Sequence, residues 1–348
     1  MGRALVRGMA VLLGFCLVAP SLAAETLRVP SDYLTIKEAL DSAVSGDTVL
    51  VAPGTYIVTL TADADTRIVM PAGVVLMSEE GPEATIIEIC QYTICIEFFD
   101  SELARVGGFT LRQSPDAGCS NPMGFTYGVH CYECTNVIVE DCIIEHLSYG
   151  IGVDGESQGW WYPIFRNNLI RNCAIGVGCY DVFGYDRPLV SGTTITNCSY
   201  GAEVRNSRPY FDSDSITYCH DGLYYYGECG GDCSRCLIAY NEACGAYIDT
   251  DPPIASPGFN LHWNKAEAND IYENGSWDIW YAHSGDDALV MAILNYWGSD
   301  CPDFDSRIHG RVNHTSWVDS THTRIITEAD CPNAAQPTTW SSIKAMYR

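Results

Sequence analysis

The chain has 348 residues and a formal net charge of −25, with lysine only at Lys37, Lys265 and Lys344. Nucleic acids and anionic membrane surfaces are bound through basic surfaces, so this charge excludes both as partners. It also disfavours a strongly anionic polysaccharide, unless calcium bridges the two acidic surfaces.

Residues 1–24 have the pattern of a secretory signal peptide. Arg3 and Arg7 precede an apolar run from Met9 to Val18 that is too short to cross a bilayer. Small residues typical of a cleavage site follow at Ser21, Ala23 and Ala24. We expect export to the periplasm or the exterior, a mature chain without a membrane span, and a monomer.

Residues 25–60 are predicted to form a cap and a first strand. Thr35 and Glu38 have the spacing of a capping box, which marks the start of a helix. An apolar helical stripe follows at Ile36, Ala39, Leu40 and Ala43, and the helix is expected to end near Gly46. This short amphipathic helix would cover the open end of the structure that follows.

Residues 61–300 contain a repeat. Six segments align on Gly128, Gly150, Gly176, Gly201, Gly222 and Gly245, and a seventh has Asp278 in the place of the glycine. The successive spacings are 22, 26, 25, 21, 23 and 33 residues. Four positions before the glycine or Asp278 stand Asn172, Asn197, Asn241 and Asn274, and three positions before it stand Cys173, Cys198 and Cys219.

Each repeat is too short to bury a core alone, so its apolar positions must be covered by the neighbouring repeats. After each glycine the residues alternate as in a strand, with the first and third positions predicted to face inward. Short strands, short turns and the absence of a helical period predict an all-β fold, a parallel β-helix. Asparagine suits its turns, because it tolerates left-handed backbone angles and can bond a stacked neighbour. Residues 301–348 are predicted to form an irregular tail.

The segment VPSDYLTIKEALDSAVSGDTVLVAPGTY, residues 29–56, resembles the opening of secreted bacterial right-handed β-helix proteins of the pectin-lyase-like superfamily. The I-x-N-C-x-x-G repeats and the closing NYWG at Asn295–Gly298 are also similar to it. The resemblance covers residues 26 to 320 and implies a right-handed parallel β-helix, or solenoid. A fold hosts many functions, so activity has to be argued from the site.

The catalytic motifs of that superfamily are missing. Val58 stands where the pectin-esterase version of the first strand has a glutamate. Asp286 and Asp287 match the paired aspartates of polygalacturonases only superficially, since they follow the last repeat. The aspartate cluster of pectate lyases has no counterpart at a matching spacing, and the D-P-H-D motif of alginate epimerases is absent. No catalytic role is carried over.

The second and fourth positions after each glycine are predicted to face outward and to form a ribbon along the stack. The candidate binding residues on this ribbon are His130, Tyr132, Asp154, Tyr180, Glu203, Arg205, Tyr224, Tyr226, Tyr247, Asp249 and Trp280. Gly152 and Gly178 would leave a dent in it. Sugar rings stack on aromatic side chains, and carboxylates and arginine bond hydroxyls, so we expect the ribbon to bind a polysaccharide. Alternatively, the aromatic rings pair only with one another and shield the sheet.

An enzymatic alternative, a polysaccharide lyase or glycoside hydrolase, rests on Glu203, Arg205 and Asp249. Glu203 and Asp249 are two repeats apart, about 10 Å along the stack, which is just compatible with an inverting pair of carboxylates. Arg205 would stabilise a developing charge, neutralise both acids, or act as the base of a lyase, for which its pKa is unfavourably high. A further alternative is a structural or adhesive surface module.

Aromatic loops at Trp160–Tyr162 and Phe183–Tyr185 either line a groove or pack onto the fold. No cofactor is expected, although calcium remains an option. The oxygen-rich turns are Asp212/Asp214, Asp249/Asp251 and Asp300/Asp303/Asp305, none of which forms a complete calcium loop.

Sixteen cysteines follow Cys16, and in an exported chain some are expected to form disulfides. Around Cys229, Cys233, Cys236 and Cys244, disulfides are favoured over a zinc site. The column Cys173, Cys198 and Cys219 is interpreted as buried small residues, although adjacent repeats are close enough for a bridge. Cys301 and Cys331 are candidates to clip the tail.

Overall fold

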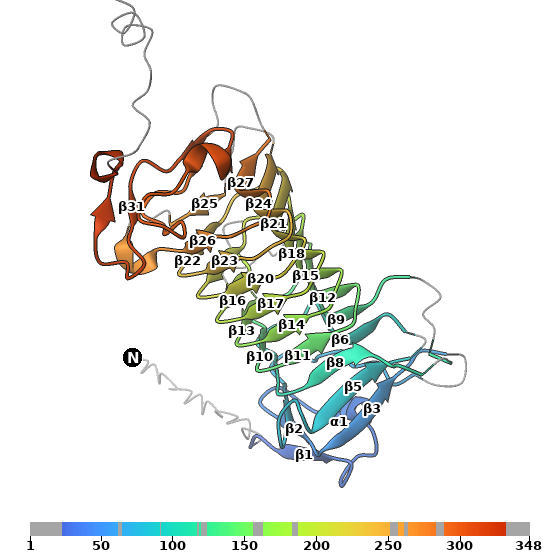
Figure 1. Cartoon of the computed structure of the whole chain (residues 1–348). Helices are drawn as coiled ribbons and strands as arrows, with labels where there is room; N and C mark the ends of the chain where they lie inside the picture. Colours follow the sequence, from blue (N-terminus) through green and yellow to red (C-terminus); the bar gives the residue numbers. More distant parts are fainter. Residues whose placement is uncertain are drawn as a thin grey trace, which may run out of the picture.

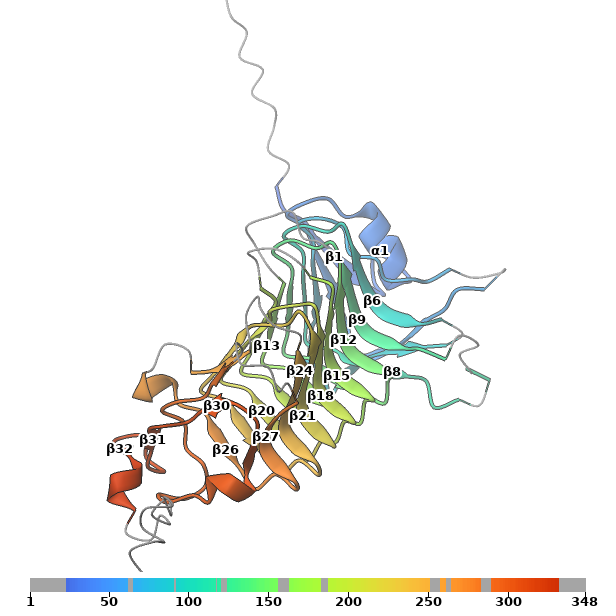
Figure 2. The same cartoon turned by 90° about the horizontal axis from the view of Figure 1, so that it is seen from above.

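The computed structural model describes residues 23–61, 65–90, 92–116, 118–119, 124–155, 163–182, 187–250, 257–260, 264–282 and 289–331. In these residues the chain winds into a stack of coils, each contributing short strands to three parallel sheets (Figure 1). Viewed after a quarter turn, the same strands lie one above another from the N-terminal to the C-terminal end (Figure 2). The predicted all-β parallel β-helix is confirmed.

The first sheet has twelve strands. They are β1 (Thr26–Val29), β2 (Thr48–Val51), β4 (Val75–Ser78), β7 (Arg105–Gly107), β10 (Ile138–Glu140), β13 (Ile164–Arg166), β16 (Leu189–Ser191), β19 (Tyr210–Asp212), β22 (Asp232–Ser234), β25 (Gly258–Phe259), β28 (Val290–Met291) and β30 (Val312–Asn313).

The second and third sheets have nine strands each. The second contains β3 (Gly54–Val58), β5 (Thr85–Ile89), β8 (Thr110–Gln113), β11 (Ile143–Glu145), β14 (Leu169–Arg171), β17 (Thr194–Thr196), β20 (Ser215–Thr217), β23 (Leu237–Ala239) and β26 (Asp270–Tyr272). The third contains β6 (Ile94–Phe99), β9 (Tyr127–Tyr132), β12 (Tyr149–Asp154), β15 (Ile175–Tyr180), β18 (Tyr200–Arg205), β21 (Asp221–Gly227), β24 (Cys244–Thr250), β27 (Trp277–Tyr281) and β29 (Ile308–His309). The repeated strand of the sequence is the strand of this third sheet.

The one α-helix among the described residues, α1 (Ile36–Ser42), lies at the N-terminal end of the stack (Figure 1). Thr35 caps it through the predicted capping box, in which Glu38 bonds back to the Thr35 backbone at 3.1 Å. Ile36, Ala39 and Leu40 are buried in the same core as the first strands, so the helix covers the open end as expected. It ends at Ser42, four residues before the predicted position near Gly46, with Ala43 as its C-cap.

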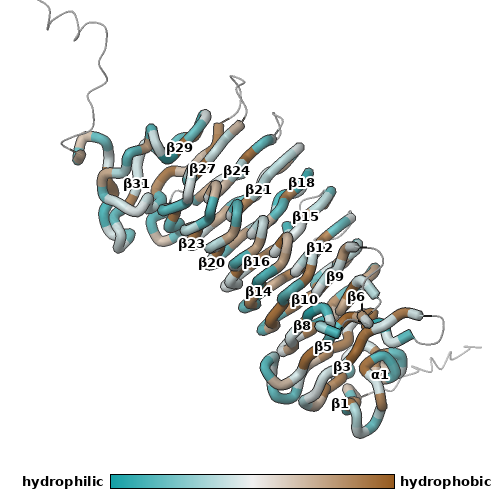
Figure 3. The backbone as a smooth tube through the Cα atoms, turned by 45° about the vertical axis from the view of Figure 1, so that its right-hand side comes forward, coloured by the Kyte–Doolittle hydropathy of each residue, from teal (hydrophilic) through white to brown (hydrophobic). Residues whose placement is uncertain are grey.

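The core is the inside of the coil, filled by the first and third residues after each repeat glycine. These positions are buried in every coil, from Val129 and Cys131 to Ile279 and Tyr281. In the hydropathy-coloured tube, apolar and polar residues alternate along the strands (Figure 3). Since adjacent coils pair strictly in register, each inward residue is covered by its equivalents above and below.

The asparagines four positions before the repeat glycine or Asp278 lie in two different environments. Asn172 and Asn197 are exposed and adopt the left-handed conformation, at φ of 53°, as predicted. Asn241 and Asn274 are instead buried, and Tyr240 and Glu273 just before them adopt positive φ. Asn241 Nδ2 donates to Asn274 Oδ1 at 2.9 Å, and Asn241 Oδ1 accepts the Cys219 N–H at 3.0 Å. One additional turn residue in the later coils moves the asparagine inside, where its amide bonds the stacked coil.

A second buried polar column stands at the turn between the first and second sheets, and the repeat alignment did not find it. Asn269 Nδ2 donates to Asn295 Oδ1 at 3.0 Å, while Asn168 and Asp214 accept backbone N–H groups of the preceding coil. The turn is tight and its backbone groups are buried, so polar side chains must satisfy them.

The cysteine predictions are partly confirmed and partly wrong. Cys301 and Cys331 form a disulfide that clips the tail, and Cys90 and Cys119 form another. The disulfides favoured around Cys229–Cys244 do not form: Cys229, Cys233, Cys236 and Cys244 are free and buried. They fill the core as small apolar side chains. The column of Cys173, Cys198 and Cys219 is likewise free and buried, as interpreted.

The C-terminal part of the described chain is irregular. It contains the short helices η1 (Lys265–Glu267), η2 (Phe304–Ser306) and η3 (Glu328–Asp330) and the antiparallel pair β31 (Trp317–Val318) and β32 (Ile325–Ile326). Trp317 is fully buried and donates its Nε1–H to the Asp300 carbonyl at 2.9 Å. Among the described residues, no helix is long and apolar enough to cross a membrane. The signal-peptide prediction for residues 1–24 falls almost entirely outside the described residues.

Candidate functional site

The outer surface of the third sheet carries the predicted ribbon in two rows. From the N-terminal to the C-terminal coil, the middle row consists of residues that are each paired in register with the next: Glu97, His130, Gly152, Gly178, Glu203, Tyr224, Tyr247, Trp280 and His309. The distal row lies two residues further along each strand and consists, coil by coil, of Phe99, Tyr132, Asp154, Tyr180, Arg205, Tyr226 and Asp249. Every candidate residue therefore stands in the row that the alignment gave it. Glu97, Phe99 and His309 extend the rows, and the sequence did not include them because their coils lack the repeat glycine.

A polar cluster lies at the centre of the third sheet, on β15, β18 and β21. The Tyr226 hydroxyl donates to Glu203 Oε1 at 3.1 Å. Burial and the adjacent Glu203 carboxylate raise the pKa of Tyr226 to about 12, so the phenol keeps its proton. Tyr180 packs beside them, with the Arg205 guanidinium 5.2 Å from its ring centroid. We call Tyr180, Glu203, Arg205 and Tyr226 the central cluster.

The glycines of the middle row do not leave a dent, contrary to the prediction. A Cβ added to Gly178 would lie 2.7 Å from the Tyr180 ring, and one added to Gly152 would lie 2.8 Å from the Tyr127 ring. The glycines thus make room for aromatic rings that lie down on the sheet. Tyr180 is consequently only 9% exposed, although it was predicted to be an open contact.

Arg205 does not connect Glu203 and Asp249, as the enzymatic alternative required. Its guanidinium pairs with Asp181, in the turn after β15, and Asn206 donates to the same carboxylate at 2.7 Å. The hydrogen bond to Asp181 raises the pKa of Arg205 above its already high ordinary value, which disfavours Arg205 as a base. Between the strands of Glu203 and Asp249 lies β21, whose Tyr226 contacts Glu203.

The aromatic residues of the ribbon stack on one another. The ring centroids of Tyr224 and Tyr247 are 5.3 Å apart, with an angle of 15° between the ring planes. For Tyr247 and Trp280 the centroid distance is 6.4 Å and the angle is 3°. For Trp280 and His309 the centroid distance is 3.9 Å and the angle is 17°. Tyr200 also packs against Tyr224 in a tilted arrangement, with ring centroids 5.0 Å apart and planes 42° apart. The ring faces are therefore occupied by neighbouring rings, and the ladder offers solvent its edges and hydroxyl groups.

Charged groups on the third sheet are mostly acidic. Glu97, Asp154, Glu203 and Asp249 stand against one guanidinium, Arg205, which is already paired. Asp154 Oδ2 lies 3.0 Å from His130 Nε2, and Asp249 is exposed. The sheet thus presents carboxylates with little compensating positive charge.

Three of the aspartates considered for calcium already have other partners. Asp214 is buried and accepts the backbone N–H groups of Thr193 and Asp212, at 2.7 and 3.0 Å. Asp212 pairs with Arg235, and Asp300 pairs with Arg324 at 2.9 Å. Asp251 lies outside the described residues, as do the aromatic loops Trp160–Tyr162 and Phe183–Tyr185. Within the described part of the chain, no group of three or more metal-ligating side chains could hold an ion.

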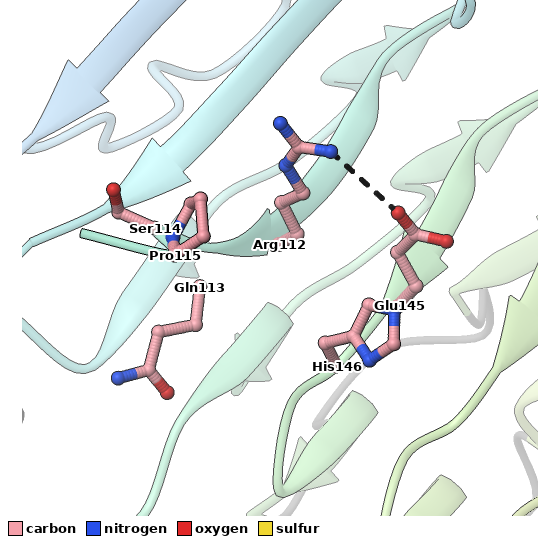
Figure 4. Close-up of a pocket in the computed structure, with 6 residues that line it drawn as sticks. All are labelled: Arg112, Gln113, Ser114, Pro115, Glu145 and His146. Carbon is pink, nitrogen blue, oxygen red and sulfur yellow. Dashed lines mark ion pairs between the residues drawn. The ribbon is translucent and has the colours of Figure 1, made fainter. Parts of the chain in front are cut away.

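A shallow hollow at the edge of the second sheet, lined by Arg112, Gln113, Ser114, Pro115, Glu145 and His146, offers few free charges (Figure 4). Glu88, Arg112, Glu145 and Arg171 alternate on four successive strands and pair with one another. The Arg112–Glu145 contact of 3.9 Å is the dashed line in Figure 4. This ionic column stabilises the stack and leaves no unpaired charge for a ligand.

Stacked coils, three parallel sheets and buried polar ladders define a parallel β-helix. A family model described as a right-handed β-helix region matches residues 127–290. The chain has a right-handed β-helix fold, as its opening segment and repeats indicated. A search of curated protein sequences gave no match.

Solved structures of two proteins illustrate the likeness. The pectate lyase Pel9A superposes with a TM-score of 0.58 at 11% identity, over 86% of this chain and 80% of the lyase. Tailspike protein 2 of the Escherichia coli O157:H7 bacteriophage CAB120 gives a TM-score of 0.56 at 10% identity, over 85% of this chain and 42% of the tailspike. At these identities the likeness shows the fold alone.

Proposed function

We propose that the chain is an exported protein that binds a glycan along the third sheet, centred on the central cluster. The observation that carries this proposal is the contact between Tyr226 and Glu203 beside Arg205. It places a phenol donor, a carboxylate acceptor and a guanidinium side by side on an otherwise aromatic surface. Sugar hydroxyls are bound by such sets of charged and uncharged hydrogen-bonding groups.

The charge of the sheet narrows the class of glycan. Four carboxylates on the two rows would repel a uronate chain, and the paired Arg205 supplies little compensation. A neutral glycan, or one that carries amino groups, meets no such repulsion. We therefore infer that the partner is neutral or amino-bearing, and that it differs in charge from pectate.

The stacked rings change how such a glycan would be held. Because the faces of Tyr224, Tyr247 and Trp280 are covered by one another, binding on this sheet would rely on ring edges and polar groups. Glu203, Asp249 and the tyrosine hydroxyls are the groups available for that. Each aromatic ring would chiefly hold the sheet flat and exclude water from the hydrogen bonds.

Export is part of the proposal. The disulfides Cys90–Cys119 and Cys301–Cys331 are typical of an oxidising compartment, which supports the signal-peptide interpretation of residues 1–24. N-terminal sequencing of the chain recovered from the periplasm or the medium would test it, with cleavage after Ala23 or Ala24 as the expected result.

A glycan array followed by product assays tests the function. The proposal predicts retention of a neutral or amino-bearing glycan, with neither reducing ends nor unsaturated sugars released. Turnover abolished by Glu203→Gln or Asp249→Asn would instead support a hydrolase or lyase. Retention of no glycan would contradict the proposal and favour a structural or adhesive module.

A further inference from the structure

A groove runs along the corner between the second and third sheets, away from the central cluster. It has a volume of about 570 Å³ and crosses the turns that connect β14 to β15, β17 to β18 and β20 to β21. Asn172, Asn197, Ser199 and His220 are among the residues that line it. The buried Cys173 and Cys198 also line it, and Tyr218 and Glu242 belong to its two most C-terminal coils. We call it the corner groove.

The polar groups of the corner groove are available. Within the described residues, the side chains of Asn172, Asn197 and Ser199 and the hydroxyl of Tyr218 make no hydrogen bond. His220 Nδ1 and Glu242 Oε2 are 3.5 Å apart, both exposed. This differs from the hollow of Figure 4, where the charged groups already pair with one another.

Tyr218 occupies a left-handed turn position that the neighbouring coils fill with Asn197 on one side and Tyr240 on the other. It has a φ of 55°, in the left-handed region that bulky residues rarely adopt, and stands where the two preceding coils have Asn197 and Asn172. Its side chain is 58% exposed, so burial in the core does not offset that backbone cost. The left-handed turn therefore presents a large aromatic ring at the surface of the stack.

One face of the Tyr218 ring is open. Tyr240, one coil toward the C-terminus, stacks on the other face, with ring centroids 5.5 Å apart and planes 10° apart. The open face is turned toward the coil of Asn197, which is the groove, and no described ring contacts it. The third-sheet ladder lacks this arrangement, since its ring faces are covered.

We propose that the corner groove is a second carbohydrate site, which holds a neutral sugar residue against the open face of Tyr218. The apolar face of the sugar ring packs on the phenol ring. The amides of Asn197 and Asn172, the Ser199 hydroxyl and the Glu242 carboxylate bond its hydroxyl groups. The site is independent of the central cluster, because none of its residues belongs to the third-sheet rows.

Isothermal titration with cellohexaose, chitohexaose and mannohexaose tests this site. The titrations use the Glu203→Gln chain, so that binding at the central cluster does not obscure the corner groove. We expect at least one of the three hexasaccharides to bind at concentrations up to about 10 mM, a range typical of weak sugar sites. Failure of all three to bind would overturn the proposal.

Two substitutions at Tyr218 separate a binding role from a structural one. Tyr218→Asn restores the residue of the preceding coils, removes the ring and relieves the backbone strain. We expect an affinity loss of about tenfold or more, with an unchanged or higher Tm. Tyr218→Phe keeps the ring and should bind within about threefold of the parent chain. Unchanged affinity in Tyr218→Asn, or a lower Tm, would overturn the proposal.

Discussion

The hydroxyl of Tyr226 donates a 3.1 Å hydrogen bond to Glu203, which lies on the neighbouring strand of the third sheet. The bond joins the distal row to the middle row, since Tyr226 is paired in register with Arg205 and Glu203 with Tyr224. It fixes one oxygen of the carboxylate and leaves the second oxygen free of the phenol. The central cluster is thus built from two coils, and neither coil contains it alone.

Removal of that hydroxyl should weaken glycan binding without unfolding the chain. In Tyr226→Phe the carboxylate of Glu203 loses its donor, and we expect affinity for the glycan retained on the array to fall about tenfold. Tyr226 is only partly buried, so Tm should stay close to that of the parent chain. Titration calorimetry measures the change, with Tyr272→Phe on the second sheet as the control. Equal affinities in Tyr226→Phe and the parent chain would contradict the role given to this hydroxyl.

The buried and the exposed asparagines of one sequence column should differ in how much the same substitution destabilises the fold. Asn241→Asp replaces a buried amide donor with an oxygen that faces Asn274 Oδ1 and the Ile216 carbonyl, and should cost about 2–4 kcal/mol of unfolding free energy. Asn172 is exposed in a left-handed turn that aspartate tolerates. Asn172→Asp should therefore change the unfolding free energy by less than about 0.5 kcal/mol. Urea unfolding compares the two. Similar losses in both variants would show that the buried ladder is not the cause.

Asp214 should make stability depend on pH. Burial is the largest effect on this carboxyl and raises its pKa to about 8 in the folded chain, whereas an unfolded aspartate titrates near ~4. The folded state therefore holds a proton that the unfolded state releases, and the unfolding free energy should fall as pH rises from about 4 to about 8.

The comparison with Asp214→Asn isolates this contribution. The variant has no carboxyl group at this position. The unfolding free energy of the parent chain should therefore fall relative to that of the variant as pH rises. Urea unfolding at pH 5 and pH 8 measures the difference at both ends of the window. A difference that stays constant between the two pH values would contradict a raised pKa for Asp214.

The sequence predicted the register of the fold better than the contacts of its side chains. The repeat glycine defines which residues alternate inward and outward, so the rows from His130 to Trp280 follow directly from it. Where a side chain lies within its row depends on its neighbours. Tyr180 folds onto the sheet because Gly178 beside it has no side chain, and spacing alone does not reveal that.

The errors have a common physical origin. Arg205 turns to Asp181 in the adjacent turn, since that carboxylate is near enough for a paired hydrogen bond, whereas alignment by strand position considered only strand residues. The same limit applies to Cys229, Cys233 and Cys236, whose closeness in sequence suggested zinc and for which expected export favoured disulfides. In the structure these side chains enter the core as buried free thiols.

The most direct test of glycan binding on the third sheet is the affinity of the Glu203→Gln chain for the array glycan, measured beside the parent chain and Tyr218→Asn. Glu203→Gln removes the charge that Tyr226 and the sugar hydroxyls would share, with the shape of the side chain preserved. The account predicts that Glu203→Gln lowers the affinity for the array glycan about tenfold or more. It also predicts that polygalacturonate binds neither the parent chain nor the Glu203→Gln chain. Equal affinity of the Glu203→Gln and parent chains, or tightest binding to polygalacturonate, would contradict it.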